Sequence, residues 1–400
     1  MILIKNGKVI ENNQLVQKDI LIENEYIVKI AEDIECDAEV IDASGCLVMP
    51  GAVDVHVHLR EPGFEKKETI KTGTLSAAKG GVTTIMPMPN LKPCPDDLDS
   101  VLLQKELLAK DSLVNAYPYG SVTVNEEDKV LADIDAFHGE VLAITDDGRG
   151  VNNIELLEKA MYLAKKYNLV VASHAEDNNY GTSDKGEYIA VRREIELAKK
   201  IGCRYHFCHM STKESFDAIR QAHKEGYTNI TCEVAPHHLV LNESDIVDAN
   251  WKMNPPLRTK ANQMETIEAL LDGTACMIAS DHAPHTEEEK SRPYNECPNG
   301  IIGLETMIPI IYTHFVNTGI ISLNKFLDVL VYNPIKVFNL PERDLKENFI
   351  ADIAIIDIEK YHTYTKEEIL SKGKNTPFIG KAYLGFPKCT LVNGKIIYRK

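Results

Sequence analysis

Side chains that can bind a metal recur where short apolar runs of the sequence end. They are His56, His58, Asp146, Asp147, His174, His209 and Asp281. Imidazole and carboxylate groups are zinc ligands, and a carboxylate can bridge two ions. Four histidines with one or two aspartates are too many ligands for one tetrahedral zinc. The set therefore predicts two metal ions about 3.5–4 Å apart that activate a bridging hydroxide, a nucleophile that needs no serine or cysteine.

The first pair of histidines lies in VDVHVHL, residues 53–59. Side chains alternate along a strand, so His56 and His58 face the same side, about 7 Å apart at ~3.3 Å per residue. The alternative is a pair of core histidines satisfied by hydrogen bonds. His or Asp at three further strand ends favours metal binding. Asp281 can hold a metal with one oxygen and move a proton with the other, or it can simply cap the loop that follows it.

Strand-like runs alternate with amphipathic helical stretches between residues 49 and 349. The eight runs are 53–59, 82–89, 114–122, 141–147, 169–174, 204–210, 228–234 and 277–282. This alternation is typical of parallel strands, and eight repeats favour a closed (β/α)8 barrel of the TIM type. An open doubly wound sheet is the alternative, but no glycine-rich nucleotide motif follows the first run. In a barrel, the metal-capable residues would meet at the carboxyl ends of the strands.

Residues 1–48 and 350–400 read differently, as short strands joined by turns. Asn-Gly pairs at 6–7 and 393–394 are turn signals. Because chain termini often lie close together, we expect both ends to form one small β-sandwich domain. The catalytic barrel would then comprise residues 49–349.

Composition limits the classes of partner. The 400 residues carry a formal net charge of −16, without a basic cluster for nucleic acid. The nine cysteines form no CxxC pair, the N-terminus lacks the order of a signal peptide, and no apolar run reaches membrane-spanning length. These features predict a cytoplasmic protein that acts on a small molecule.

Several motifs together resemble the metal-dependent dihydroorotases of the bacterial single-polypeptide kind, within the amidohydrolase superfamily. They are DVHVHLREPG, MPMPN, TDDG, SHAED, CHMSTKES, KMNPPLR and SDHAPHTEEEK. The resemblance implies a (β/α)8 barrel, a small β domain, two zinc ions per subunit and hydrolase chemistry on a cyclic amide. The implied reaction is the reversible cyclisation of N-carbamoyl-L-aspartate to L-dihydroorotate, a step of pyrimidine biosynthesis.

The resemblance also implies roles for the metal-capable residues. His56 and His58 bind one ion, His174 and His209 bind the other, and Asp281 is a ligand and the acid/base. Many cyclic amidohydrolases bridge their ions with a carboxylated lysine on strand four, but this chain has no lysine in VLAITDDG. Asp146 and Asp147 face opposite ways on a strand, so only one can point inward. The resemblance favours Asp147.

Substrate contacts are implied at a further set of positions. They are His58, Arg60, Asn90, Asn254, His285, Asn299 and Gly300. The planar fork of Arg60 suits a bidentate carboxylate contact, with Asn90 as a second contact to that carboxylate. The alternative for Arg60 is a surface ion pair with Glu61 or Glu65. The loop 285–300 is either a lid or a solvated face.

Two other functions stay open at this point. One is a different cyclic amidohydrolase, such as a hydantoinase or allantoinase, against which the missing strand-four lysine argues. The other is an inactive scaffold partner of aspartate transcarbamoylase, although such chains lack several ligands that are present here. A homo-oligomer and an association with aspartate transcarbamoylase are further open expectations.

Overall fold

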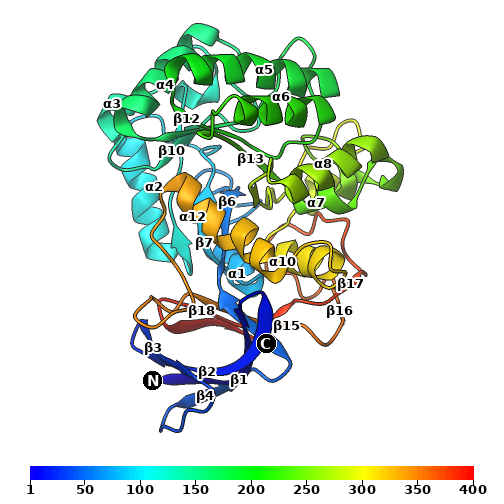
Figure 1. The fold of residues 1–400 in the computed structure, drawn as a ribbon. Helices are drawn as coiled ribbons and strands as arrows, with labels where there is room; N and C mark the ends of the chain where they lie inside the picture. The colour runs from blue at the N-terminus through cyan, green and yellow to red at the C-terminus, as the bar shows by residue number, and fades with distance from the viewer.

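The strands of the central region close into a parallel barrel in the computed structural model, which describes residues 1–400 (Figure 1). The strands are β6 (Ala52–Val57), β7 (Val82–Pro87), β8 (Asn115–Ala116), β9 (Gly120–Ser121), β10 (Ala143–Thr145), β11 (Val170–Ser173), β12 (Arg204–Phe207), β13 (Ile230–Val234) and β14 (Met277–Ile278). They form a three-stranded sheet, β6-β7-β8, and a six-stranded sheet running from β9 to β14. A parallel bridge between Val57 and His282 joins the two ends. The prediction of a (β/α)8 barrel is confirmed.

The third predicted strand, 114–122, is divided into two pieces. β8 pairs with β7, and β9 pairs with β10. Pro118 lies between the two pieces. Because proline has no backbone N–H, it interrupts the ladder at this point. The barrel therefore continues through two short strands in place of one.

Helices surround the barrel strands. They are α1 (Ile70–Lys79), α2 (Leu98–Asp111), α3 (Ile134–Phe137), α4 (Ile154–Tyr167), α5 (Asp184–Ile201), α6 (Lys213–Lys224), α7 (Pro236–Val240), α8 (Lys260–Asp272), α9 (Glu287–Lys290), α10 (Met307–Ile311), α11 (Leu323–Leu327) and α12 (Asn333–Phe338). Short 3-10 helices are η1 (Val124–Glu126), η2 (Glu243–Asp245) and η3 (Ala249–Trp251), and π-helical segments are η4 (Tyr312–Val316) and η5 (Asp328–Tyr332). Asp97 shows why α2 begins where it does, because its side chain accepts a hydrogen bond from the N–H of Ser100 at 2.8 Å. Strands and helices bury one common core of 87 residues.

Both chain ends build a second sheet, which lies below the barrel in Figure 1. Its strands are β1 (Ile2–Glu11), β2 (Gln14–Glu23), β3 (Tyr26–Ala31), β4 (Glu39–Asp42), β5 (Cys46–Pro50), β15 (Ile353–Asp357), β18 (Pro387–Val392) and β19 (Lys395–Arg399). The order is β19-β18-β15-β5-β1-β2-β3, with β4 beside β1. The small domain expected to be a β-sandwich is thus built from one hydrogen-bonded sheet. This sheet has its own core of 14 buried residues.

The two Asn-Gly pairs have different structures. Asn393 and Gly394 connect β18 to β19 with φ of 48° and 72°, the left-handed conformation that tight hairpins need. The expectation of a turn at Asn6-Gly7 is wrong. This pair lies inside β1 at an irregularity of its pairing with β2, where Asn6 has φ of 62°. The same dipeptide that makes a turn accommodates a bulge here.

Part of the C-terminal region leaves this sheet and packs on the barrel. Residues 364–380 lie between β16 (His362–Thr363) and β17 (Ala382–Tyr383). In this segment, the Asn375 amide donates to the carbonyl oxygens of Ala283 and Gly300, at 3.0 and 2.9 Å. Asn375 therefore links the chain's last segment to the loops at the mouth of the barrel.

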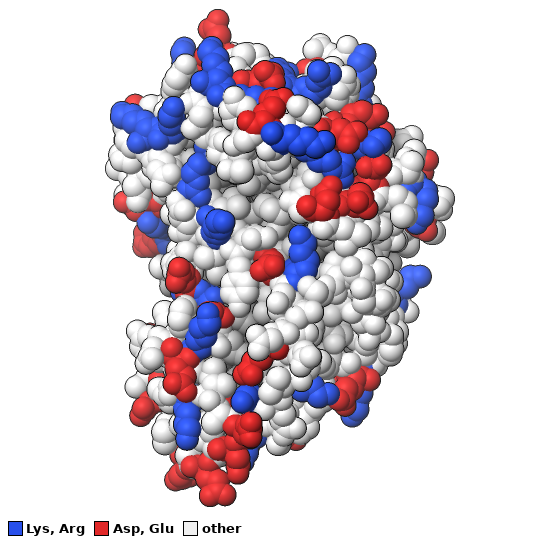
Figure 2. Space-filling view, viewed as in Figure 1, with Lys and Arg blue, Asp and Glu red and all other residues white.

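The surface carries charges of both signs. On the face shown in Figure 2, Lys and Arg side chains are interspersed with Asp and Glu, and no broad area is purely basic. None of the helices combines the length and the apolar character that a membrane crossing requires.

Candidate active site

His56 and His58 reach the centre of the barrel from β6 and the residue just beyond it. The Nε2 atom of His56 lies 3.3 Å from Asp147 Oδ1 and 3.5 Å from Asp281 Oδ1. The Nε2 atom of His58 lies 3.4 Å from Asp147 Oδ2 and 3.2 Å from Asp281 Oδ1. All four side chains are buried. Strand alternation thus brings both imidazoles to the inner face, as the spacing predicts.

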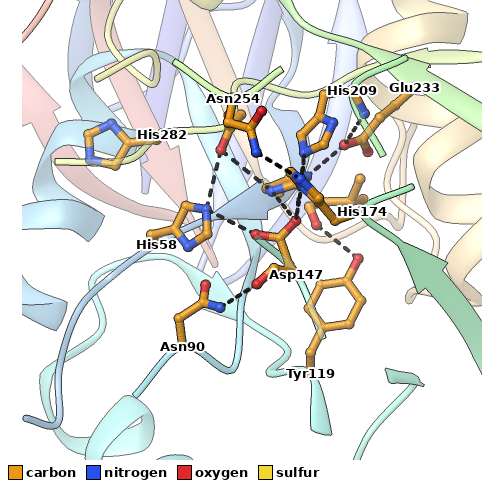
Figure 3. Close-up of polar contacts among 12 residues, drawn as sticks. His58, Asn90, Tyr119, Asp147, His174, His209, Glu233, Asn254 and His282 are labelled. Carbon is orange, nitrogen blue, oxygen red and sulfur yellow. Dashed lines mark hydrogen bonds and ion pairs between the residues drawn. The ribbon is translucent and has the colours of Figure 1, made fainter. Parts of the chain in front are cut away.

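His174 and His209 approach Asp147 from the other side, after β11 and β12. His174 Nδ1 and His209 Nε2 each lie 3.6 Å from Asp147 Oδ1, and they are 3.0 Å from each other (Figure 3). His209 and Asp281 have left-handed backbones, with φ of 34° and 48°. Non-glycine residues in this region are strained, and such strain is typical of functional sites.

The arrangement provides candidate metal ligands. Three groups of three side chains have ligand atoms within 4.8 Å of one another: His56 with His58 and Asp147, Asp147 with His174 and His209, and His56 with Cys208 and Glu233. His56 Nε2 and Asp147 Oδ1 are buried without a hydrogen-bond partner, although buried polar atoms are normally paired. Burial acts to raise the pKa of Asp147, but the neighbouring histidines outweigh it and hold that pKa well below its usual value.

Asp146 points away from this cluster. Its Oδ1 accepts hydrogen bonds from the backbone N–H groups of Val122 and Thr123, at 2.8 and 3.0 Å. These bonds fix the loop that follows β9. Of the two neighbouring aspartates, Asp147 is the one that faces the histidines.

Arg60 lies beside the cluster, in a cavity of about 380 Å³ at the barrel mouth. Its guanidinium forms no ion pair or hydrogen bond, and its Nε is buried without a partner. The two alternative ion-pair partners are engaged elsewhere, because Glu61 accepts a hydrogen bond from the N–H of Ile70 and Glu65 accepts one from the N–H of Gly63, both at 2.7 Å. Burial lowers the pKa of Arg60, but a guanidinium stays protonated. The cavity thus contains an unpaired positive charge.

The other predicted substrate residues line the same cavity. They are His58, Asn90, Asn254, His285, Asn299 and Gly300. His285 Nε2 is 2.8 Å from the Asn299 carbonyl oxygen, and burial lowers the pKa of this imidazole to about 3. The N–H of Gly300 donates to the Lys252 carbonyl at 3.0 Å. The amide nitrogens of Asn90 and Asn254 donate hydrogen bonds as well, while the Oδ1 atoms of these two residues are buried without a partner.

A larger hollow of about 500 Å³ lies elsewhere, between α2 and the strands β8 and β10. It contains no cluster of metal-capable residues. The one lysine and one glutamate in its wall, Lys105 and Glu140, pair with each other at 2.6 Å. This hollow therefore lacks the cluster of side chains that the smaller cavity contains.

Comparison with known proteins gives a consistent result. A family model described as dihydro-orotase-like matches residues 45–215. Dihydroorotases from Fusobacterium nucleatum and Staphylococcus aureus are 43% and 44% identical, covering 99% of this chain and 98–99% of their own. The chain belongs to the dihydroorotase family. The resemblance inferred from its motifs is confirmed.

Solved structures that are similar to this chain include hydantoinases and dihydropyrimidinases. The L-hydantoinase (dihydropyrimidinase) of Arthrobacter aurescens matches with a TM-score of 0.88 at 26% identity, over 100% of this chain and 96% of that one. The dihydropyrimidinase of Brevibacillus agri matches with the same TM-score and the same identity, over 99% of this chain and 95% of that one.

Two glutamates of this dihydroorotase-family site, the buried Glu233 and the half-buried Glu176, were missed by the sequence analysis. Glu233 on β13 lies with Oε1 2.8 Å from His56 Nδ1 and with Oε2 3.1 Å from His206 Nε2. Burial acts to raise the pKa of Glu233, but the bonds to the two histidines lower it to about 2. Glu176 lies 3.3 Å from His174 Nε2. Each carboxylate engages the ring nitrogen that faces away from Asp147, which orients the other nitrogen toward the cluster.

Proposed function

We propose that this chain is a zinc-dependent dihydroorotase that interconverts N-carbamoyl-L-aspartate and L-dihydroorotate. The observation that carries the proposal is the unpaired guanidinium of Arg60 in the same cavity as the histidine–aspartate cluster. An anionic ring substrate needs both features, a cation for its carboxylate and a site that activates water. Full-length relatives named dihydroorotase support the same assignment.

The residues that would hold zinc are those whose ligand atoms converge. We assign His56 and His58 to one ion, His174 and His209 to the other, and Asp147 to both, with Asp281 as a further ligand. When bound, such ions polarise a carbonyl and lower the pKa of water toward about 7. The chain's own contribution is to orient the imidazoles, through Glu233 and Glu176, and to bury the cluster.

Asp281 is the residue that we assign to proton transfer. Its carboxylate lies at the edge of the cluster beside His58 and lines the substrate cavity. In ring opening it would take the proton of the attacking water and deliver it to the leaving ring nitrogen, and in ring closure the reverse. Burial acts to raise the pKa of Asp281, but the hydrogen bond to His58 and the charge of His56 outweigh it and hold the pKa below its usual value, so the carboxylate is ionised before it takes the proton.

Arg60 is the proposed partner of the substrate carboxylate. Its planar fork can donate two parallel hydrogen bonds, which an ammonium cannot reproduce. Asn90, Asn254, His285, Asn299 and Gly300 remain the other proposed substrate contacts, on the basis of their position in the cavity wall.

The Arg60→Lys variant tests this proposal. We expect KM for dihydroorotate to rise roughly 10–100-fold with a smaller change in kcat, because a charge-assisted hydrogen bond is lost while the metal cluster is untouched. Arg192→Lys on the exposed part of α5 serves as the control and should leave KM unchanged. An unchanged KM in Arg60→Lys would count against a carboxylate contact.

A hydantoinase activity is the second candidate, favoured by the structural similarity to hydantoinases. Hydantoins with a neutral 5-substituent have no carboxylate to pair with Arg60. We therefore expect ring opening of dihydroorotate to exceed that of such hydantoins. Opening of hydantoins without turnover of dihydroorotate would reverse the assignment.

The cellular setting belongs to the proposal as well. All nine cysteines are free thiols, which supports a reducing compartment such as the cytoplasm. A homo-oligomer and an association with aspartate transcarbamoylase stay predictions that light scattering of the chain, alone and mixed with that enzyme, can test.

A further inference from the structure

The loop from Ala283 to Gly300 carries part of the proposed substrate site. Ala283, His285, Asn299 and Gly300 all line the cavity. The loop follows β14, and its only regular element is the short helix α9. Because regular backbone hydrogen bonds fix so little of this loop, its position depends on contacts from other parts of the chain.

Asn375 holds both ends of this loop with one side chain. Its Nδ2 atom donates to the carbonyl oxygens of Ala283 and Gly300, at 3.0 and 2.9 Å. Its Oδ1 atom accepts from the backbone N–H of His285 at 3.0 Å. Both donors and the acceptor of the amide are therefore in use, and only 3% of the residue is exposed. Three hydrogen bonds from a single buried amide thus close the base of the loop.

His285 is held at two points as a result. Asn375 binds its backbone N–H, and the Asn299 carbonyl oxygen lies 2.8 Å from its ring Nε2. The residue after Asn299 is Gly300, whose carbonyl oxygen Asn375 also binds. Asn375 therefore fixes the backbone of His285 and also the neighbour of its ring partner. It does so from outside, since Asn375 is not part of the cavity wall.

The segment that carries Asn375 is anchored to the barrel. Glu305 Oε1 accepts from the backbone N–H of Leu370 at 2.8 Å, and Glu68 Oε2 accepts from the hydroxyl of Ser371. Both glutamates are buried. They precede the barrel helices α10 and α1, so the segment is attached at two separate places. Its amide is therefore a fixed support against which the loop can be held.

Gly373 brings the same segment into close contact with the loop. A Cβ atom added at this glycine would lie 2.8 Å from Pro284 Cβ and 2.7 Å from Asn375 Oδ1. Atoms that are not bonded do not approach so closely, so a larger residue here would displace one of the two. The segment and the loop are thus joined by close packing as well as by hydrogen bonds.

We propose that Asn375 is a positioning residue that holds His285 against the substrate and thereby determines the affinity of the site. This inference rests on the proposed function, because it takes dihydroorotate as the ligand and His285 as one of its contacts. It extends the substrate site to residue 375, beyond the barrel limit of residue 349 that the sequence predicts. The C-terminal region then contributes to substrate binding as well as to the second sheet.

Steady-state kinetics of the zinc-loaded enzyme test the inference. Asn375→Ala should raise KM for dihydroorotate about 5–50-fold with kcat within about 3-fold, because binding is weakened while the metal cluster is unchanged. Asn375→Asp keeps the acceptor for His285 but loses both donors, so it should raise KM at least as much. In a His285→Ala background, Asn375→Ala should change KM by no more than about 3-fold, because the two residues act as one unit.

Asn333→Ala is the matched control. Asn333 Nδ2 donates to the Cys276 carbonyl oxygen at 2.7 Å, just before β14 and thus at the end of this strand that is remote from the barrel mouth. The control loses the same kind of bond and should leave KM unchanged. Zinc content and melting temperature are measured for every variant. If Asn375→Ala does not fold, Gly373→Ala replaces it, since the added methyl group displaces Asn375 or Pro284 and should also raise KM.

Hydrogen exchange gives a second readout, which needs no turnover. The His285 N–H loses its partner in Asn375→Ala, so the peptide 283–290 should exchange at least about 10-fold faster than in the parent. The same peptide should exchange at the parent rate in Asn333→Ala.

Several results would overturn the inference. An unchanged KM in Asn375→Ala, or a KM near the parent value in Asn375→Asp, would exclude a role of the Asn375 donors in binding. An equal rise in KM with and without His285 would exclude action through that residue, and a loss of zinc in Asn375→Ala would place the effect at the metal cluster. Unchanged hydrogen exchange contradicts the positioning role whether or not the parent is active, whereas absence of turnover by the zinc-loaded parent contradicts the proposed function itself.

Discussion

His56 presents Nε2 to the cluster because Glu233 engages its other ring nitrogen at 2.8 Å. His174 is held in the same way, with Glu176 at 3.3 Å from Nε2 and Nδ1 directed at Asp147. Such carboxylate partners fix the orientation of an imidazole and increase its basicity as a ligand. At the scale of single residues, we therefore expect the metal affinity of the proposed site to depend on side chains that are not themselves ligands.

Glu233→Gln tests this dependence. We expect the zinc affinity to fall about 10–100-fold, because the neutral amide supports the His56 imidazole less well. Zinc binding is measured by competition with a coloured chelator. The control is Glu194→Gln, which alters another buried glutamate that bonds Ser173 and Tyr205 away from the cluster. Equal zinc affinity in the parent and in Glu233→Gln would contradict the role of Glu233.

Asp281→Asn tests the proton-transfer role. An amide cannot accept the proton, so we expect kcat to fall about 10²–10⁴-fold. The fold and most of the bound zinc should remain, because the other proposed ligands are unchanged. Steady-state rates and metal analysis are measured on the same preparation. A kcat within a few-fold of the parent value would show that another group moves the proton.

At the scale of elements, the strands explain what the sequence could and could not predict. Period-two alternation placed His56 and His58 on one face, and the strand-helix repeat placed the other proposed ligands at the same mouth of the barrel. Glu233 was within reach of this reasoning, because it is a charged residue in the buried strand β13. The burial of Glu126 could not be predicted in this way. This residue lies in a polar stretch that is typical of a surface turn, and its burial comes from contacts with residues distant in the sequence.

The turn η1 should make stability depend on pH in a defined way. The pKa of Glu126 is raised by burial from an ordinary 4.5 to about 8, so the folded state binds more protons than the unfolded state between these values. Relative to Glu126→Gln, the parent should therefore lose stability as pH rises from about 5 to about 8, on the order of a few kcal/mol.

Urea unfolding of both proteins at several pH values measures this difference. Comparing the two variants cancels the titration of groups that they share. A difference in the free energy of unfolding that stays constant from pH 5 to pH 8 would show that Glu126 titrates normally.

At the scale of the whole molecule, segments far apart in the sequence meet at one site. The proposed ligands come from the ends of β6, β10, β11, β12 and β14, and Asn375 of the C-terminal segment holds the loops around Ala283 and Gly300. The complete cluster therefore needs the whole span from His56 to Asp281. Because ions that bind only the folded barrel stabilise it, zinc should raise the melting temperature as well as the activity.

The most direct test is a zinc titration of the metal-free full-length protein, followed by the ultraviolet change on dihydroorotate ring opening. The account predicts almost no activity without metal and a rise that saturates near two equivalents of zinc per chain. Full activity in protein from which chelation has removed all metal, or no gain in activity on adding zinc to folded protein, would contradict it.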